Sequence, residues 1–183
     1  MKQLALALAL TGVLALGAPA TPATAAIETY EAKAIAASAA QIARADMLEA
    51  FGPKRLKPGQ YLWRDVPASA GPDRVVVSLS DQLAFLYRGD TLAAVATIAS
   101  GTKKNPTPTG IFKVLEKKTM HHSRKYDNAP MPFMQRIDRF GIALHAGHNP
   151  GHPASHGCIR LPREFAQKLY KVTDIGTPVL IGV

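Results

Sequence analysis

From Arg74 onward, turn residues divide the chain into short apolar segments, and this pattern constrains the fold more than any other feature. The segments are rich in β-branched residues or alternate apolar with charged residues, as strands with one wet face do. They are 74–80 (RVVVSLS), 83–87 (LAFLY), 91–100 (TLAAVATIAS), 111–118 (IFKVLEKK), 140–145 (FGIALH) and 177–183 (TPVLIGV). We therefore predict a mainly β domain of the α+β class, built as an antiparallel sheet or sandwich.

Two segments interrupt the strands. Pro162 suits the first turn of a helix, and Phe165, Leu169 and Val172 then form one apolar face. Residues 121–138 show no clear period, and we predict an irregular lid or binding loop there, with Met131 and Met134 packed inside it and His121 and His122 exposed. The methionine and aromatic residues of segment 121–138 argue against a disordered surface loop.

The chain before this domain has two parts. Residues 1–25 combine Lys2, an apolar run and a small-x-small site, which predicts a secretory signal peptide. Residues 26–72 are predicted as a helical and irregular lead-in to a catalytic domain at 73–183. The alanine-rich helix expected in this lead-in has only a weak apolar stripe (Ile35, Ala39, Ile42), so we expect a loosely packed helix or spacer.

Charge and export together limit the partners. The chain has a net charge of +9, and removal of Lys2 with the signal leaves +8. Such basicity raises nucleic acid as a partner, but export argues against it. We expect a protein of the periplasm or cell wall that meets anionic wall polymers and keeps no membrane span after cleavage.

Cys158 is the only cysteine, so the chain cannot form an internal disulfide. It is an inert buried thiol, one half of an intermolecular bridge, or a reactive thiolate. Residue statistics alone favour the buried thiol.

The neighbours of Cys158 favour reactivity. Residues 145–162 (HAGHNPGHPASHGCIRLP) hold four of the six histidines beside the thiol. A histidine can serve as the base that activates a cysteine nucleophile. Gly157 permits a tight turn whose N–H groups could stabilise an oxyanion, and Arg160 could bind a carboxylate. Spacing alone leaves His145, His148 and His156 open as the base.

Zinc is the weaker reading of the same stretch, because the group contains no paired cysteine. We predict no metal and no cofactor. His148 and His152 are interpreted as polar loop residues.

The stretch resembles the active-site signature of the bacterial L,D-transpeptidases, in which an upstream His and a variable loop precede Ser/Thr-His-Gly-Cys. The resemblance extends to SLSDQLAFLYRGD (78–90), to TPTG (107–110) before IFKVL, and to the closing GTPVLIGV (176–183). It covers about 74–183, and it implies the sandwich of that catalytic domain, with one helix after the cysteine.

The resemblance also implies roles for single residues. Cys158 matches the nucleophile that takes an acyl group from a peptidoglycan stem peptide. His145 matches the general base, oriented by a backbone carbonyl just after it. Ser155, His156 and Gly157 match the turn that binds the oxyanion, and Arg160 matches a position held by Arg or Asn in the family.

Three outcomes stay open at this point. The acyl group could pass to an amine, which would make the protein a transpeptidase. It could pass to water, which would make it a carboxypeptidase or a wall-link hydrolase. A non-catalytic wall-binding module is the third reading, and oligomeric state is not predicted.

Overall fold

The computed structural model describes residues 26–183, so the predicted signal peptide lies outside the described residues. The elements in chain order are β1 (Ala26–Ile27), α1 (Tyr30–Phe51), β2 (Tyr61–Trp63), η1 (Ala68–Ala70), β3 (Asp73–Ser78), β4 (Leu83–Arg88), β5 (Thr91–Thr97), β6 (Gly110–Lys113), β7 (Glu116–His122), β8 (Pro130–Arg136), β9 (Ala143–Ala146), β10 (Ile159–Leu161), α2 (Arg163–Val172) and β11 (Pro178–Gly182). Across 26–183, no helix has the length and apolar character that a membrane span requires.

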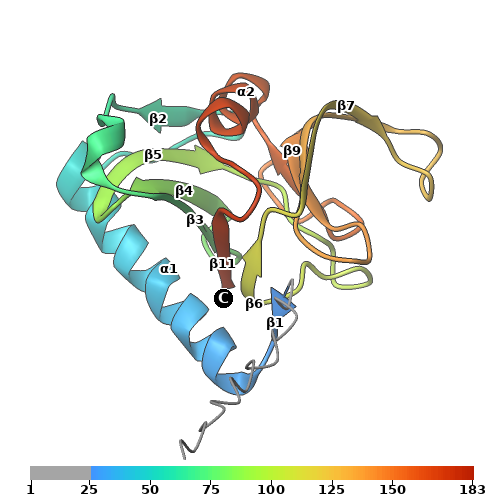
Figure 1. Cartoon of the computed structure of the whole chain (residues 1–183), viewed down its shortest axis with the longest axis horizontal. Helices are drawn as coiled ribbons and strands as arrows, with labels where there is room; N and C mark the ends of the chain where they lie inside the picture. Colours follow the sequence, from blue (N-terminus) through green and yellow to red (C-terminus); the bar gives the residue numbers. More distant parts are fainter. Residues whose placement is uncertain (1–25) are drawn as a thin grey trace, which may run out of the picture.

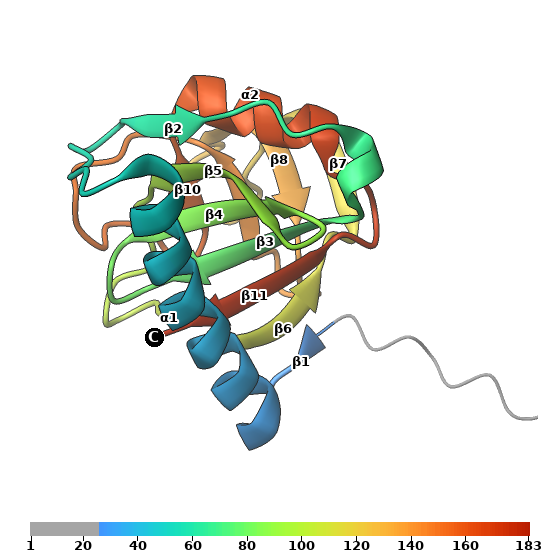
Figure 2. The same cartoon turned by 90° about the vertical axis from the view of Figure 1, so that its left-hand side faces the viewer.

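The strands form two sheets (Figures 1 and 2). A seven-stranded sheet has the order β1-β6-β11-β3-β4-β5-β2, and a four-stranded sheet has the order β10-β9-β8-β7. The α+β class is confirmed, but both sheets are mixed rather than purely antiparallel. The chain returns through α2 so that β11 runs parallel to β3, and a long loop makes β10 parallel to β9. Consecutive parallel strands such as β9 and β10 need a crossover connection between them, which the long loop supplies.

Both faces of the central strands β3, β4 and β5 are buried, which explains their nearly continuous apolar sequences. Val75 and Val77 face the core shared with the four-stranded sheet and α2, whereas Val76 faces α1 together with Phe85 and Val95. Side chains alternate between the faces of a strand, so a strand covered on both sides needs apolar residues at every position.

Helix α1 packs tightly across the seven-stranded sheet (Figure 2), so the prediction of a loose helix or spacer is wrong. The predicted stripe is also wrong, because Ile35 and Ile42 are 54% and 57% exposed. The buried face consists of small residues and one methionine: Ala32, Ala36, Ala40, Ala43 and Met47. Alanines allow close approach, and a Cβ added to Gly182 of β11 would lie 2.4 Å from the Ala36 carbonyl oxygen.

Residues 121–138 are mostly a β-hairpin and not an irregular lid, which corrects the prediction for this segment. Strands β7 and β8 pair from Glu116–Arg136 to His122–Pro130. Phe133 within β8 has φ +55°, and this left-handed residue breaks the alternation of side chains. Met131 and Met134, three positions apart, therefore pack in the same cluster beside Cys158. The hairpin extends away from the core in Figure 1.

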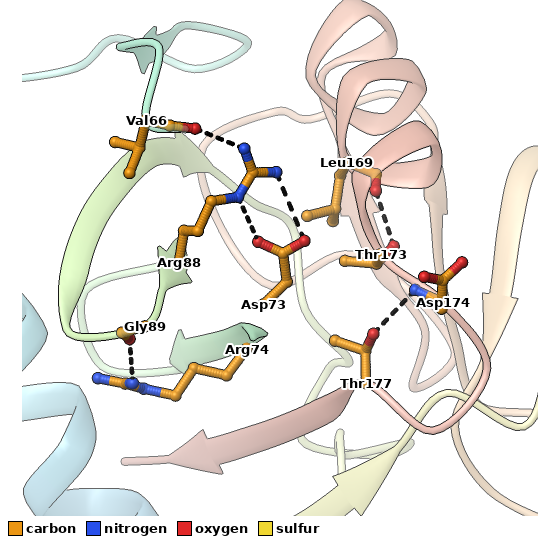
Figure 3. Close-up of polar contacts among 9 residues, drawn as sticks. All are labelled: Val66, Asp73, Arg74, Arg88, Gly89, Leu169, Thr173, Asp174 and Thr177. Atoms are coloured by element: carbon orange, nitrogen blue, oxygen red, sulfur yellow. Dashed lines mark hydrogen bonds and ion pairs between the residues drawn. The ribbon is translucent and has the colours of Figure 1, made fainter. Parts of the chain in front are cut away.

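The lead-in is attached to the sheet at several points. Strand β2 forms the edge beside β5, and Tyr61 and Trp63 pack on Phe165 of α2. Figure 3 shows a second attachment, where Arg88 donates to the Val66 carbonyl and pairs with Asp73 at 2.9 Å.

The helix predicted after Pro162 is confirmed as α2, with Phe165 and Leu169 buried. The ammonium group of Lys117 in β7 donates hydrogen bonds to the carbonyls of Tyr170 and Thr173 at the end of this helix. A cation is favourable there because the helix dipole is negative at its C-terminus. Thr177 then accepts a hydrogen bond from the Asp174 N–H at 2.8 Å, which shapes the turn into β11 (Figure 3).

Candidate active site

The hydrogen-bond register of β9 and β10 brings the predicted nucleophile and base onto one face of the four-stranded sheet. His145 pairs with Arg160, and Cys158 lies two residues before Arg160, so all three side chains share a face. The alternate residues point to the core: Leu144, Ala146, Ile159 and Leu161. The spacing of paired strands puts the Cα atoms of His145 and Cys158 about 8 Å apart, which an imidazole and a thiol can span.

His145 is buried, with 7% of its surface exposed, and its ring is held by the backbone. Its Nδ1 lies 2.9 Å from the Ala146 carbonyl oxygen, and a carbonyl only accepts, so Nδ1 carries the proton. Nε2 is therefore left with a free lone pair. The orienting group is the carbonyl of the next residue, as the family resemblance implies.

The environment of His145 keeps the ring neutral. Burial lowers the pKa of His145 to about 4, and the nearby charges of Arg160 and His121 act in the same direction. The hydrogen bond with Ala146 opposes these effects. At neutral pH the imidazole can therefore accept a proton, as a general base must.

Cys158 is half-buried against Met131 and Met134, and it is a thiol rather than a thiolate at rest. Burial raises the pKa of Cys158, and a backbone hydrogen bond at Ala143 opposes that effect. The Sγ atom lies 3.7 Å from the Gly141 carbonyl oxygen. The sulfur thus needs a base at the moment of attack, and His145 of the neighbouring strand β9 shares its face.

Ser155 organises the turn before the cysteine through both functions of its hydroxyl. The Oγ donates to the Cys158 carbonyl at 2.5 Å and accepts from the Gly157 N–H at 3.0 Å. Gly157 has φ +112°, and a Cβ there would lie 2.6 Å from Ile142, so glycine is required. The Gly157 N–H is used within the turn, which leaves those of His156 and Cys158 as candidate oxyanion donors.

Thr107 is part of the site, although its chemistry was not recognised from the sequence. Its hydroxyl donates to the Gly157 carbonyl at 2.8 Å and accepts from the Gly101 N–H at 2.8 Å. It thereby connects the TPTG turn to the SHGC turn, 50 residues away. The TPTG motif itself was the available signal, because it belongs to the resemblance.

The other histidines do not share the position of His145. His148 and His152 are exposed on the loop, and the His156 ring stacks on Tyr126 of the β7–β8 hairpin at 4.2 Å between centroids. His121 was expected to be exposed, but it is half-buried in β7, and its charge acts on His145. Its place opposite Met131 in the hairpin explains the difference.

Arg160 is half-buried beside His145, and its side chain lies on Gly147. A Cβ at Gly147 would lie 3.0 Å from the Arg160 Cγ atom. This position suits a cation that faces a substrate carboxylate. Within residues 26–183, no three His, Cys, Asp or Glu side chains are grouped so that they could hold a metal ion.

Comparison of the sequence with models of known protein families identifies the family of this chain. The model of the L,D-transpeptidase catalytic domain, YkuD, matches residues 72–181. The chain belongs to this family. No curated protein matches the sequence significantly.

Solved structures of L,D-transpeptidases share the fold. Those from Mycobacterium smegmatis (20% identity, TM-score 0.56), Mycobacterium tuberculosis (25%, 0.55) and Xylanimonas cellulosilytica (26%, 0.56) align over 61%, 60% and 65% of this chain. The chain spans 58%, 57% and 64% of their lengths, less than two thirds in each case.

The L,D-transpeptidase domain thus brings together His145, Cys158, Arg160 and the SHGC turn, all of which were predicted. The family match begins at residue 72, so α1 and β2 lie outside it, although both pack on the same sheet.

Proposed function

We propose that this protein is an exported acyltransferase that acts on peptidoglycan stem peptides through a Cys158 thioacyl-enzyme. The observation that carries the proposal is the β9–β10 register, which puts a neutral, oriented His145 on the same sheet face as a half-buried thiol. Membership of the L,D-transpeptidase family supplies the substrate class.

The first half-reaction uses residues of one sheet face and one turn. His145 Nε2 takes the proton from Sγ as the sulfur attacks the carbonyl carbon of the donor peptide. The N–H groups of His156 and Cys158 are the donors proposed for the resulting oxyanion. As the tetrahedral intermediate collapses, His145 returns the proton to the leaving amine, and a thioester remains on Cys158.

The second half-reaction restores the thiol. An acceptor amine attacks the thioester carbonyl, His145 removes a proton from that amine, and the proton passes to the departing sulfur. The product is a new amide bond, the reaction of cell-wall cross-linking. With water as acceptor, the same residues would release a free carboxylate and act as an L,D-carboxypeptidase.

Covalent labelling tests the first half-reaction. A carbapenem carries a strained amide that a cysteine nucleophile opens, so the intact protein should gain the mass of one carbapenem. The Cys158→Ala variant should gain none. No adduct on the wild type, or an adduct on the variant, would contradict the assignment, and the former would favour a non-catalytic wall-binding module.

Muropeptide products identify the acceptor. The protein is incubated with purified tetrapeptide muropeptides, and the products are separated and weighed. Cross-linked dimers would support transfer to an amine, whereas tripeptides alone would support the carboxypeptidase.

Export is tested separately, by N-terminal sequencing of the protein recovered outside the cytoplasm, with cleavage expected near residue 25.

A further inference from the structure

A short segment of the lead-in, residues 57–60, lies against the loop 147–154 that joins His145 to Cys158. The Thr97 hydroxyl stands at the crossing of the two. It accepts from the Gly59 N–H at 3.0 Å and from the Asn149 side-chain amide at 3.1 Å, and it donates to the Gln60 carbonyl at 3.1 Å. A hydroxyl has one donor and two acceptor positions, so all of its capacity is used.

Asn149 is bonded at both ends of its side-chain amide. The Nδ2 group donates to Thr97, and Oδ1 accepts from the Gly151 N–H at 3.0 Å. This assigns the amide orientation, because Oδ1 must face the N–H. The contact folds the loop at Gly151, which has φ +87°.

Pro58 completes the contact by packing on the fold of the loop. A Cβ added to Gly151 would lie 2.5 Å from the Pro58 Cγ atom, so the proline ring packs directly on the backbone of Gly151. The first half of the loop is therefore held by the hydrogen bond of Asn149 to Thr97 of β5 and by the packing of Pro58 of the lead-in on Gly151.

The second half of the loop is held by the catalytic domain itself. The Ala154 and Ser155 N–H groups both donate to the Ser100 carbonyl, at 2.9 and 3.0 Å. The Ser100 N–H in turn donates to the Gln82 side chain at 3.1 Å. Loss of the Asn149–Thr97 hydrogen bond would thus free the part of the loop next to His145 and leave the SHGC turn in place.

We propose that Asn149 is a positioning residue that, through the Thr97 hydroxyl to which the lead-in is also bonded, holds loop 147–154 as a wall of the substrate site. The proposal rests on the proposed function, since the loop borders a site for substrate only if Cys158 is acylated there. Strand register sets the positions of His145 and Cys158, so the loop acts on substrate binding and not on the chemical step.

The test compares binding with chemistry for a tetrapeptide muropeptide. Acyl-enzyme formation on Cys158 is followed by mass spectrometry at increasing muropeptide concentration, which gives a half-saturating concentration and a limiting rate. For Asn149→Ala we expect the half-saturating concentration to rise about 10-fold and the limiting rate to stay within about 3-fold. Thr97→Val should behave like Asn149→Ala, and Thr97→Ser, which keeps the hydroxyl, should restore wild-type binding.

Two controls separate positioning from general damage. Gln41→Ala changes an exposed side chain of α1, outside the loop and the proposed site, and should leave both constants unchanged. The melting temperature of each variant shows that it is folded. A double variant of Asn149 and Thr97 should be no worse than either single variant, because both remove one contact.

Three results would overturn the proposal. Unchanged constants in Asn149→Ala, or a fall in the limiting rate alone, would do so while the proposed function stands, since the wild type would still form the acyl-enzyme. No acyl-enzyme on the wild type would overturn both.

Discussion

The two sheets share one core but divide the work of the molecule. The seven-stranded sheet is buried on both faces in β3, β4 and β5 and is covered by α1. The four-stranded sheet turns one face to the same core, and its other face carries His145, Arg160 and Cys158. Substitutions on the outer face of the four-stranded sheet should therefore reduce catalysis, whereas substitutions in the seven-stranded sheet should reduce stability.

The largest effect is expected on the outer face of the four-stranded sheet. His145→Ala removes the proposed base, and acylation by a carbapenem should slow by about 10²- to 10⁴-fold. His148→Ala and His152→Ala, in the same stretch but exposed, should change the rate little. The rates are measured by mass spectrometry of the adduct. Near-normal acylation in His145→Ala would move the role of base to another histidine.

The same residue should make stability depend on pH. The pKa of folded His145 is about 4, below the value of 6.5 for a free imidazole, so the unfolded chain takes up the proton first as the pH falls. The stabilisation is complete above about pH 6.5 and is lost as the pH falls through about 4. Urea unfolding at about pH 7 and about pH 5 should show a loss of stability that is smaller in His145→Gln.

Glu116 sets the lower limit of that experiment. Hydrogen bonds from Lys118 and Arg136 lower the pKa of Glu116 to about 2, so its contribution is lost only as the pH falls below about 4.5. Above that pH the loss reports the histidines whose pKa is lowered, which include His121 as well as His145, and the difference between the wild type and His145→Gln gives the share of His145. An equal loss of stability in the wild type and His145→Gln would contradict the assignment of a neutral, buried ring.

The seven-stranded sheet should respond in stability alone. Gly182→Ala places a methyl group against the Ala36 carbonyl of α1, and we expect a loss of about 1–3 kcal/mol in the free energy of unfolding. The acylation rate of the folded protein should stay unchanged. A Gly182→Ala protein as stable as the wild type would contradict the close approach of α1 to β11 at this position.

The smallest effect is expected where the hairpin meets the SHGC turn. Tyr126→Ala removes the ring on which His156 stacks, and such a pair contributes about 0.5–1.5 kcal/mol. Tyr126→Phe keeps the stack and should match the wild type in urea unfolding. A Tyr126→Ala protein as stable as Tyr126→Phe would show that the stack adds no stability.

Local patterns predicted α2 and strands β3, β4, β5, β6, β9 and β11, because alternation and apolar runs are properties of neighbouring residues. Spacing left three histidines open as the base, and the family resemblance singled out His145. The α1 face was missed because a search for large apolar residues overlooks alanines, whose value lies in close approach. Strand β8 was not predicted because the left-handed residue Phe133 interrupts the alternation of apolar and polar side chains that identifies a strand. Thr97, Thr107 and Asn149 were missed because their partners are far away in sequence.

The parallel pairing of β9 with β10 has a consequence for how this site can change. A sequence separation of 13 residues says little about the distance between base and nucleophile, because backbone hydrogen bonds set that distance. A slip of β10 by one residue would turn Cys158 to the opposite face, whereas residues inserted at the tip of loop 147–154 would leave both catalytic side chains in register. The loop can thus acquire new length, and new partners, without rebuilding the catalytic pair.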